Sequence, residues 1–374
     1  MRNFMANDQD NHLYNIDLLR FLFSLVIINH HLFVKPFLFV TMKGQIPLLN
    51  SIWAKSLKGY LGVEFFFILA GVWLGKTIES NNLDIKTFVQ RKIIRLWPVL
   101  AFSILCFWIV SLFGLTKFQK YSDVLNLLFL QSNGLTLSFG DNETAWFVSC
   151  LFWVSIFYFS LYKTIQSKSF YFIVSMIVYF CFVLMINNKS GSFNCHLKPV
   201  IFSLFNFGMI RAAAEIGLGI GLWKIFSALS EKNSEPSLTS KILYGSAELF
   251  LLIVIFNNLA FRHFKFANDL FLTLAIAGLI LLFMLKRGGL SLALNQKFFG
   301  KLGAVSYSIY MMQEVFFVFL AKGLSVYYNK LLTAPDSVIL TVYIGCLIAP
   351  VCLGTITYAL VEKQSVIRML RRNK

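Results

Sequence analysis

The chain has few charged residues. Asp, Glu, Lys and Arg make up only 14% of its 374 residues, whereas they account for roughly a quarter of a soluble domain. Apolar residues reach 57% and aromatic residues 17%, with 41 Phe among them. This composition excludes an ordinary soluble domain and indicates an all-α integral membrane protein.

Cysteine is scarce as well, which excludes a disulfide framework. All of the 6 cysteines except Cys195 lie within apolar runs, so no set of loop thiols is available for pairing. Cys195 and His196 are adjacent, which is not the spacing of metal ligands, and we expect no metal. The polar N-terminal segment lacks the apolar core and cleavage site of a signal peptide. We therefore expect the first apolar run to stay in the mature protein.

Apolar runs of about twenty residues recur along the chain, and each is long enough to cross a bilayer core of roughly 30 Å. They cover residues 16–40, 59–76, 96–114, 144–163, 170–187, 207–227, 242–261, 268–286, 304–325 and 338–361. The stretch 122–131 is too short to span and is expected as a surface or re-entrant helix. We predict about ten transmembrane helices in one bundle, forming a membrane domain at 16–361 between a segment at 1–15 and a basic tail at 362–374.

An even number of spans puts both termini on the same side of the membrane. The loops on that side carry most of the lysines and arginines, so the positive-inside rule predicts that both termini are cytoplasmic. The net charge of +17 is then explained by an anionic inner leaflet, and no nucleic-acid partner is expected.

Two ionisable residues, Arg20 and His31, lie in the first predicted span. Eleven positions at about 100° each end within about 20° of whole turns, so both side chains share a helix face about 16 Å apart in depth. Ionisable groups inside a membrane are functional by default, because their desolvation is costly. Histidine can also take up a proton near neutral pH. The alternative is structural, with an arginine that reaches the head groups and a histidine bonded to a neighbouring helix.

Further polar side chains are expected near the depth of His31, in the outer half of the membrane. Counting about 1.5 Å per residue from the span ends places Glu64, Glu143, Trp146, Arg211 and Glu215 in this outer layer. Arg211 and Glu215 are one helix turn apart, so they can pair with each other or with a ligand. A purely structural ion pair is the alternative.

A basic segment, Arg91-Lys92-Ile93-Ile94-Arg95, precedes the third predicted span at the cytoplasmic surface. Arg91 and Arg95 can present both guanidinium groups on one helix face, which suits bidentate phosphate binding. The alternative is a basic flank that only sets the topology. With the outer layer, this segment predicts a tunnel that holds phosphates at its cytoplasmic mouth and a proton acceptor near its outer mouth.

Five blocks of the sequence resemble, in order, the acyltransferase family 3 membrane proteins, which acylate cell-surface polysaccharides, lipopolysaccharide, peptidoglycan and some antibiotics. The blocks are Ile16–Arg20 with His31, Gly59–Gly71, Arg91–Pro98, Gly303–Gln313 and Val361–Lys363. Lys92 stands where the family usually has the first of two arginines. Gln313 replaces the histidine of many members, and Leu151 replaces a glutamate downstream of Trp146.

The resemblance implies a multi-pass enzyme of the bacterial cytoplasmic membrane. It would move an acyl group, most often acetyl, from cytoplasmic acyl-CoA to a hydroxyl of a cell-surface or lipid-linked glycan. The expected partners are the acyl-CoA donor, a glycan or glycolipid acceptor and membrane lipids. Many members carry a fused extracellular hydrolase-like domain, and we expect this chain to act as a stand-alone transferase without one.

These patterns assign a role to each candidate residue. We expect His31 to be the general base for the acceptor hydroxyl, Arg20 to contact the donor, and Glu64 to orient the imidazole or bind sugar hydroxyls. The donor phosphates are expected at Arg91, Lys92 and Arg95. The expected substrate-binding residues are Glu143, Trp146, Arg211, Glu215, Tyr307 and Gln313.

Two other functions fit the same sequence. In a permease or flippase for an acidic or glycosylated lipid, the same charges would line an alternating-access path, and transport would not need acyl-CoA. In a catalytically inactive scaffold of a polysaccharide assembly complex, Gln313 and Leu151 would mark lost catalytic groups.

Overall fold

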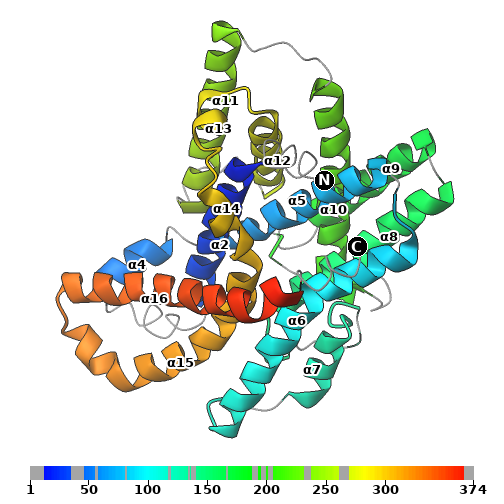
Figure 1. Ribbon diagram of the computed structural model, residues 1–374. Coiled ribbons are helices and arrows are strands. Elements are labelled where there is room, and N and C mark those ends of the chain that lie inside the picture. The colour runs from blue at the N-terminus through cyan, green and yellow to red at the C-terminus, as the bar shows by residue number, and fades with distance from the viewer. Residues whose placement is uncertain are drawn as a thin grey trace.

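The protein is almost entirely helical (Figure 1). The computed structural model describes residues 12–34, 46–54, 58–80, 82–116, 119–133, 135, 140–165, 167–187, 193–194, 199–200, 205–230, 237–260 and 269–365. In chain order its elements are α2 (Tyr14–Val34), α4 (Pro47–Ala54), the 3-10 helix η1 (Gly59–Leu61), α5 (Gly62–Ser80), α6 (Ile85–Leu112), α7 (Lys120–Leu127), α8 (Ala145–Ile165), α9 (Ser167–Ile186), β1 (Pro199–Val200), β2 (Phe205–Asn206), α10 (Phe207–Ser230), α11 (Leu238–Ala260), α12 (Asp269–Leu285), α13 (Gly289–Ala293), α14 (Phe299–Ala304), α15 (Ser306–Leu332), α16 (Asp336–Thr357) and the π-helix η2 (Tyr358–Glu362).

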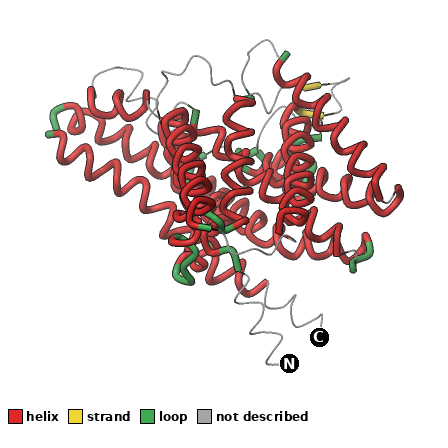
Figure 2. The backbone as a smooth tube through the Cα atoms, turned by 90° about the horizontal axis from the view of Figure 1, so that it is seen from above, coloured by secondary structure: helices red, strands yellow, loops and turns green. Residues whose placement is uncertain are grey.

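Nine helices in the described part of the chain are long and apolar enough to cross a membrane, and α12 is a shorter apolar helix of 17 residues. Together they correspond to the ten predicted spans, so the all-α membrane fold is confirmed. The short helix expected at 122–131 is present as α7. Figure 2 shows the long helices in one bundle, with the two-residue antiparallel strands β1 and β2 at its rim.

The third span starts earlier than predicted. The prediction began it at residue 96, where the apolar run begins, but α6 begins at Ile85. Asp84 caps this helix, because its carboxylate accepts a hydrogen bond from the backbone N–H of Thr87 at 3.3 Å. The basic segment 91–95 therefore belongs to the helix and not to a loop before it.

Helix α2 lies in the middle of the molecule (Figure 1). It contacts α5, α12, α14, α15 and α16. Its apolar residues reach into three of the hydrophobic clusters of the bundle. A polar side chain on α2 therefore meets other protein groups over most of the helix length and not lipid.

The tightest helix crossing brings α5 against α10. A Cβ on Gly71 would collide with the Ile216 carbonyl oxygen, and a Cβ on Gly219 would collide with the Ile68 carbonyl oxygen. Small residues let membrane helices approach to backbone contact. This crossing holds Glu64, a buried carboxylate of α5, against α10.

Candidate active site

His31 faces α15 and meets there a carboxylate that was not singled out from the sequence. Its Nδ1 lies 3.6 Å from Oε1 of Glu314, and the two side chains are 21% and 5% exposed. The neighbouring His30 is buried on a different side of α2, against Gly59 and the Tyr60 ring. The imidazole of His31 thus has a carboxylate beside it and is only partly buried.

Glu314 could have been singled out from the sequence. It is an ionisable residue inside a predicted span, as Glu64 is, and it directly follows Gln313. Which side of α15 turns toward α2 depends on helix packing, however, so the pairing with His31 emerges only in three dimensions.

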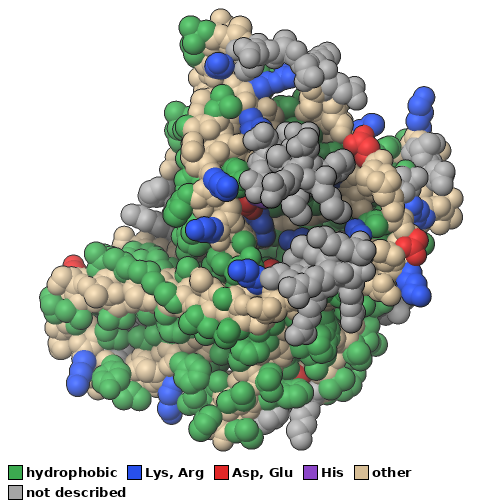
Figure 3. All heavy atoms as spheres, in the orientation of Figure 1, with side chains coloured by type: hydrophobic (Ala, Val, Ile, Leu, Met, Phe, Trp, Pro, Cys, Tyr) green, Lys and Arg blue, Asp and Glu red, His purple; other side chains and the backbone are tan. Residues whose placement is uncertain are grey.

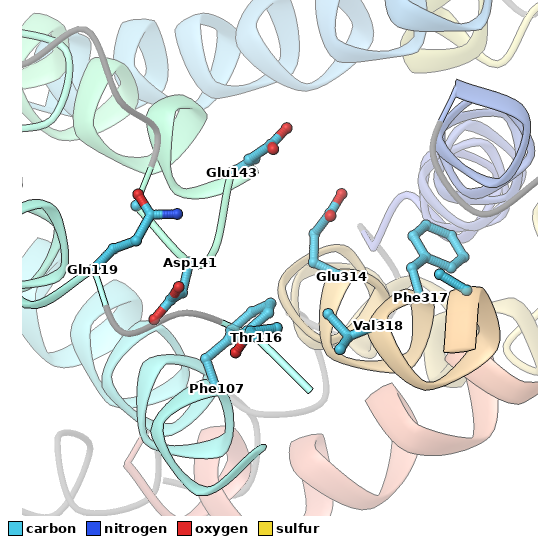
Figure 4. A pocket seen from close by; sticks show the side chains of 10 residues that line it. Phe107, Thr116, Gln119, Asp141, Glu143, Glu314, Phe317 and Val318 are labelled. Carbon is cyan, nitrogen blue, oxygen red and sulfur yellow. The ribbon is translucent and has the colours of Figure 1, made fainter. Parts of the chain in front are cut away.

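A cavity of about 270 Å³ lies beside Glu314. It is lined by residues of α6, of α15 and of the segments on either side of α7: Phe107, Thr116, Gln119, Gly140, Asp141, Glu143, Glu314, Phe317, Val318 and Ala321. Figure 4 shows Glu143 and Glu314 reaching toward the same space from two different elements. Glu143, a predicted substrate-binding residue, therefore shares a cavity with the carboxylate that lies beside His31.

The segment that carries Glu143 is fixed in place by Asn142. The Nδ2 of Asn142 donates to Ser103 Oγ at 2.8 Å and to the Met311 carbonyl at 3.1 Å. Its Oδ1 accepts a hydrogen bond from Thr144 Oγ1 at 2.6 Å. These bonds join the segment to α6 and α15, which line the cavity. Asn142 was missed from the sequence, because a loop asparagine has no pattern that sets it apart.

Asp141 lines the cavity next to another carboxylate, Asp123. The backbone N–H of Asp141 donates to Asp123 Oδ1 at 3.0 Å, and Trp108 Nε1 donates to Asp123 Oδ2 at 2.8 Å. Burial, with a hydrogen bond to Asp123 and repulsion from its charge, raises the pKa of Asp141 to about 7. Asp141 therefore gains or loses its proton near neutral pH.

The raised pKa of Asp141 predicts a pH-dependent stability. The folded protein holds this proton more tightly than the unfolded chain, in which the pKa of Asp141 is near 3.8. Its contribution to the free energy of unfolding is therefore fully present below about pH 4 and is lost as the pH rises to about 7. We expect Asp141→Asn, which cannot ionise, to gain stability relative to the wild type between these pH values, as measured by heat denaturation in detergent. Asp336→Asn, an exposed aspartate at the start of α16, is the control. If Asp141→Asn differed in stability from the wild type by the same amount at pH 4 and at pH 8, the expectation would be contradicted.

Arg211 forms a buried ion cluster with two glutamates. Its Nη2 lies 2.6 Å from Glu64 Oε1, and its Nε lies 3.2 Å from Glu64 Oε2 and 3.4 Å from Glu215 Oε1. The three side chains are at most 1% exposed. Arg211 also donates to the Tyr60 carbonyl at 3.0 Å and lies over the Trp146 ring, 5.7 Å from its centroid.

The sequence predicted that Arg211 and Glu215 share one helix face, and the structure brings them together. It adds Glu64 as the closer partner, with both carboxylate oxygens accepting hydrogen bonds from the guanidinium. This burial favours the structural ion pair that the sequence left open. Substrate contact by Arg211, Glu215 or Trp146 stays a prediction, as does the action of Glu64 on His31.

Arg20 belongs to a second polar cluster, which we call the Arg20 cluster: Asp17, Arg20, Arg95, Tyr307 and Glu362. The Nη1 of Arg20 lies 3.0 Å from Asp17 Oδ1. The charges of Arg20, Glu362 and Asp17 all act on the Arg95 guanidinium, whose side chain is exposed. Figure 3 shows Lys and Arg side chains gathered around the middle of the face seen in Figure 1.

Helix α15 and the π-helix η2 complete the Arg20 cluster from the far end of the chain. The Tyr307 hydroxyl donates to the Leu96 carbonyl of α6 at 2.7 Å, and Ser308 Oγ donates to Glu362 Oε2 at 2.6 Å. Four of the five family-like sequence blocks therefore meet here, although they are spread over the chain from Ile16 to Lys363.

Lys92 and Arg91 differ in what they contact. The Nζ of Lys92 donates to Ser155 Oγ of α8 at 3.2 Å and lies 5.5 Å from the centroid of the Phe88 ring. The Nε of Arg91 is buried and has no hydrogen-bond partner among the described residues. Arg91 therefore keeps a donor for a ligand, in a helix whose next turn carries Arg95.

Gln313 lies within α15 beside Glu314 and is fully buried. Neither its Oε1 nor its Nε2 has a hydrogen-bond partner in the part of the chain that the structure describes. Its predicted role in substrate binding remains a prediction.

The described residues contain no group of three or more His, Cys, Asp or Glu side chains that could hold a metal ion. Cys195 and His196, the pair considered from the sequence, lie outside the described residues.

Comparison with known proteins agrees with the sequence resemblance. Neither a curated protein nor a solved structure matches the chain. The acyltransferase domain of acyltransferase family 3 matches residues 13–358, which include both the His31–Glu314 pair and most of the Arg20 cluster. With nearly the whole chain covered, the protein belongs to this family and is a membrane acyltransferase.

Proposed function

We propose that the protein transfers an acyl group, above all acetyl, from acyl-CoA to a hydroxyl of a cell-surface or lipid-linked glycan. The observation that carries the proposal is the position of His31, whose imidazole lies beside the Glu314 carboxylate next to a cavity. An alcohol attacks a thioester readily only when its proton has an acceptor, and a histidine positioned by a carboxylate provides one.

In the proposed reaction, His31 takes the proton of the acceptor hydroxyl while the oxygen attacks the acyl carbon. The carbon–sulfur bond then breaks, and the CoA thiolate leaves with the proton returned by the imidazolium. Glu314, with only 5% of its side chain exposed, holds the imidazole and stabilises its positive charge.

The donor would bind at the other end of α2, where the Arg20 cluster lies. Acyl-CoA carries several phosphate charges, and guanidinium groups bind phosphate with two parallel hydrogen bonds. The unpartnered Nε of Arg91 and the exposed side chain of Arg95 support this placement. With both termini cytoplasmic, this end of the bundle faces the bacterial cytoplasm, the compartment that supplies acyl-CoA.

Changing both Arg91 and Arg95 to Gln is expected to weaken CoA binding by at least about 100-fold, because two charge-assisted bonds worth about 1.5–3 kcal/mol each are lost and about 1.4 kcal/mol is a factor of ten. The weaker binding is measured in membranes as a smaller rise of the denaturation temperature on addition of CoA. A ligand at 100 times its Kd stabilises the folded state by about 2.7 kcal/mol. Lys241→Gln, an exposed basic residue at the start of α11, is the matched control.

The same measurement separates the enzyme from the permease or flippase. A transporter that works without acyl-CoA gives no stabilisation by CoA in the wild type. Equal stabilisation in the wild type and in the Arg91→Gln, Arg95→Gln variant would place the donor elsewhere.

A further inference from the structure

We propose that Gln313 binds the acyl carbonyl oxygen of the donor and stabilises the negative charge that this oxygen gains during transfer. This rests on the proposed function, in which a hydroxyl activated by His31 attacks the acyl carbon of acyl-CoA.

The amide of Gln313 is buried without a hydrogen-bond partner. Gln313 is 0% exposed, and neither its Oε1 nor its Nε2 has a partner among the described residues. An unpaired buried polar atom costs about 1–3 kcal/mol, and native proteins contain few of them. A side chain with two such atoms is expected where a ligand supplies the missing hydrogen bonds.

The periodicity of α15 turns Gln313 toward α2. Ile309 and Phe317 lie one turn before and one turn after it, and both belong to the same hydrophobic cluster as Ile28 and Leu32 of α2. Residues four apart share a helix face. The Gln313 amide therefore lies on the side of α15 that packs against α2.

Along the axis of α15, Gln313 lies at the level of the His31 pair. It directly precedes Glu314, whose Oε1 lies 3.6 Å from Nδ1 of His31. Tyr307, a member of the Arg20 cluster, is six residues or about 9 Å earlier along the same helix. A donor with its phosphates at the Arg20 cluster extends its arm along this stretch and brings the acyl group to His31 and Gln313.

Gln313 stands apart from the cavity beside Glu314. Glu314 and Phe317 line that cavity (Figure 4), and Gln313 is not part of its described lining. The amide is therefore assigned to the donor and not to the acceptor hydroxyl.

The reacting end of acyl-CoA offers a partner to each atom of the amide. The thioester carbonyl oxygen accepts a hydrogen bond from Nε2 of Gln313, and the first amide N–H of the CoA arm, two methylene groups beyond the sulfur, donates to Oε1. When the hydroxyl attacks, the C=O electron pair moves onto the oxygen, and it returns as the carbon–sulfur bond breaks. Gln313 keeps its own protons throughout, and an N–H group fixed in a buried site stabilises such a charge more strongly than water does.

Gln313→Met tests the proposal, because methionine fills similar space and lacks the amide. Membranes containing the full chain receive labelled acetyl-CoA and the glycan acceptor. We expect kcat to fall about 100- to 1,000-fold, the usual effect of removing one hydrogen-bond donor to a developing oxyanion. The pH dependence of transfer should stay as in the wild type, because His31 is untouched. The denaturation midpoint should be unchanged or higher, because two unpaired buried polar atoms are removed.

Two further variants complete this test. Gln313→His, whose ring N–H can donate to the same oxygen, should recover at least 10-fold of the lost kcat. Gln296→Met changes an exposed glutamine before α14 and should alter neither kcat nor the midpoint. Wild-type kcat in Gln313→Met overturns the proposal and leaves the acyltransferase function intact. A lower midpoint together with lost transfer makes Gln313 structural, and a shifted pH dependence makes it act through His31, so either result also overturns the proposal.

Infrared spectroscopy of bound acetyl-CoA labelled with ¹³C at the carbonyl gives a second readout, which needs no acceptor. We expect the C=O stretching frequency to be lower in the wild type than in Gln313→Met, because the hydrogen bond from Nε2 weakens the C=O bond. Equal frequencies, or no bound acetyl-CoA, overturn the proposal. If the wild type acylates no glycan, the proposed function fails, and the frequency difference still decides the role of Gln313.

Discussion

Replacing His31 with alanine is expected to lower acyl transfer by about 100- to 10,000-fold, which is the contribution typical of a general base. The acceptor hydroxyl then has no nearby group to take its proton. The measurement is transfer of label from acetyl-CoA to glycan in membranes, at matched amounts of protein. Glu314→Gln should lower kcat by a smaller factor and leave KM for acetyl-CoA unchanged, because Glu314 acts through the imidazole of His31, which lies about three helix turns along α2 from Arg20.

CoA binding at the Arg20 cluster is the folding control for this prediction. Arg20 and Arg95 belong to a different cluster, so His31→Ala should still be stabilised by CoA as the wild type is. Loss of both transfer and CoA stabilisation would indicate a misfolded variant, in which case His31→Gln repeats the test. Normal transfer by a variant that still binds CoA would rule out His31 as the base.

Replacing Arg211 with methionine is expected to destabilise the protein by about 3–5 kcal/mol. The change leaves Glu64 and Glu215 buried at 0% exposure without their cation, and an uncompensated buried charge has a cost of this size. Heat denaturation in detergent, followed by loss of soluble protein, measures the effect.

Glu215→Gln is the matched control for the Arg211 prediction. Two carboxylates share one guanidinium in this cluster, and Glu215 is the more distant partner at 3.4 Å against 2.6 Å for Glu64. Removing the surplus charge should leave the denaturation midpoint unchanged or raise it. A larger loss in Glu215→Gln than in Arg211→Met would contradict this account of the cluster.

The sequence predicted the spans well because each one requires a long apolar run, whatever its neighbours are. It was less accurate at the start of α6. The first turns of this helix are polar and lie before the apolar run, and the capping residue Asp84 has no hydropathy signal. The pairing of Arg211 with Glu215 followed from helix periodicity alone. The stronger pairing with Glu64 did not, because it depends on the close crossing of α5 and α10 at Gly71 and Gly219.

Among the candidate site residues too, some were predicted from the sequence and others were found only in the structure. Arg20, His31 and the basic segment 91–95 were found because ionisable groups near or within apolar runs stand out. Glu314 and Asn142 were missed, although the structure places them beside His31 and the cavity.

The sequence by itself determined that this is a helical membrane protein with about ten long apolar runs and with charges at two depths of its first helix, since composition and periodicity are local properties of the chain. Only the tertiary structure decided which charges meet. Tertiary packing decides that His31 meets Glu314, that Arg211 meets Glu64 and that Glu362 joins the Arg20 cluster. These contacts depend on how helices distant in sequence pack and rotate against one another, and no local pattern encodes that.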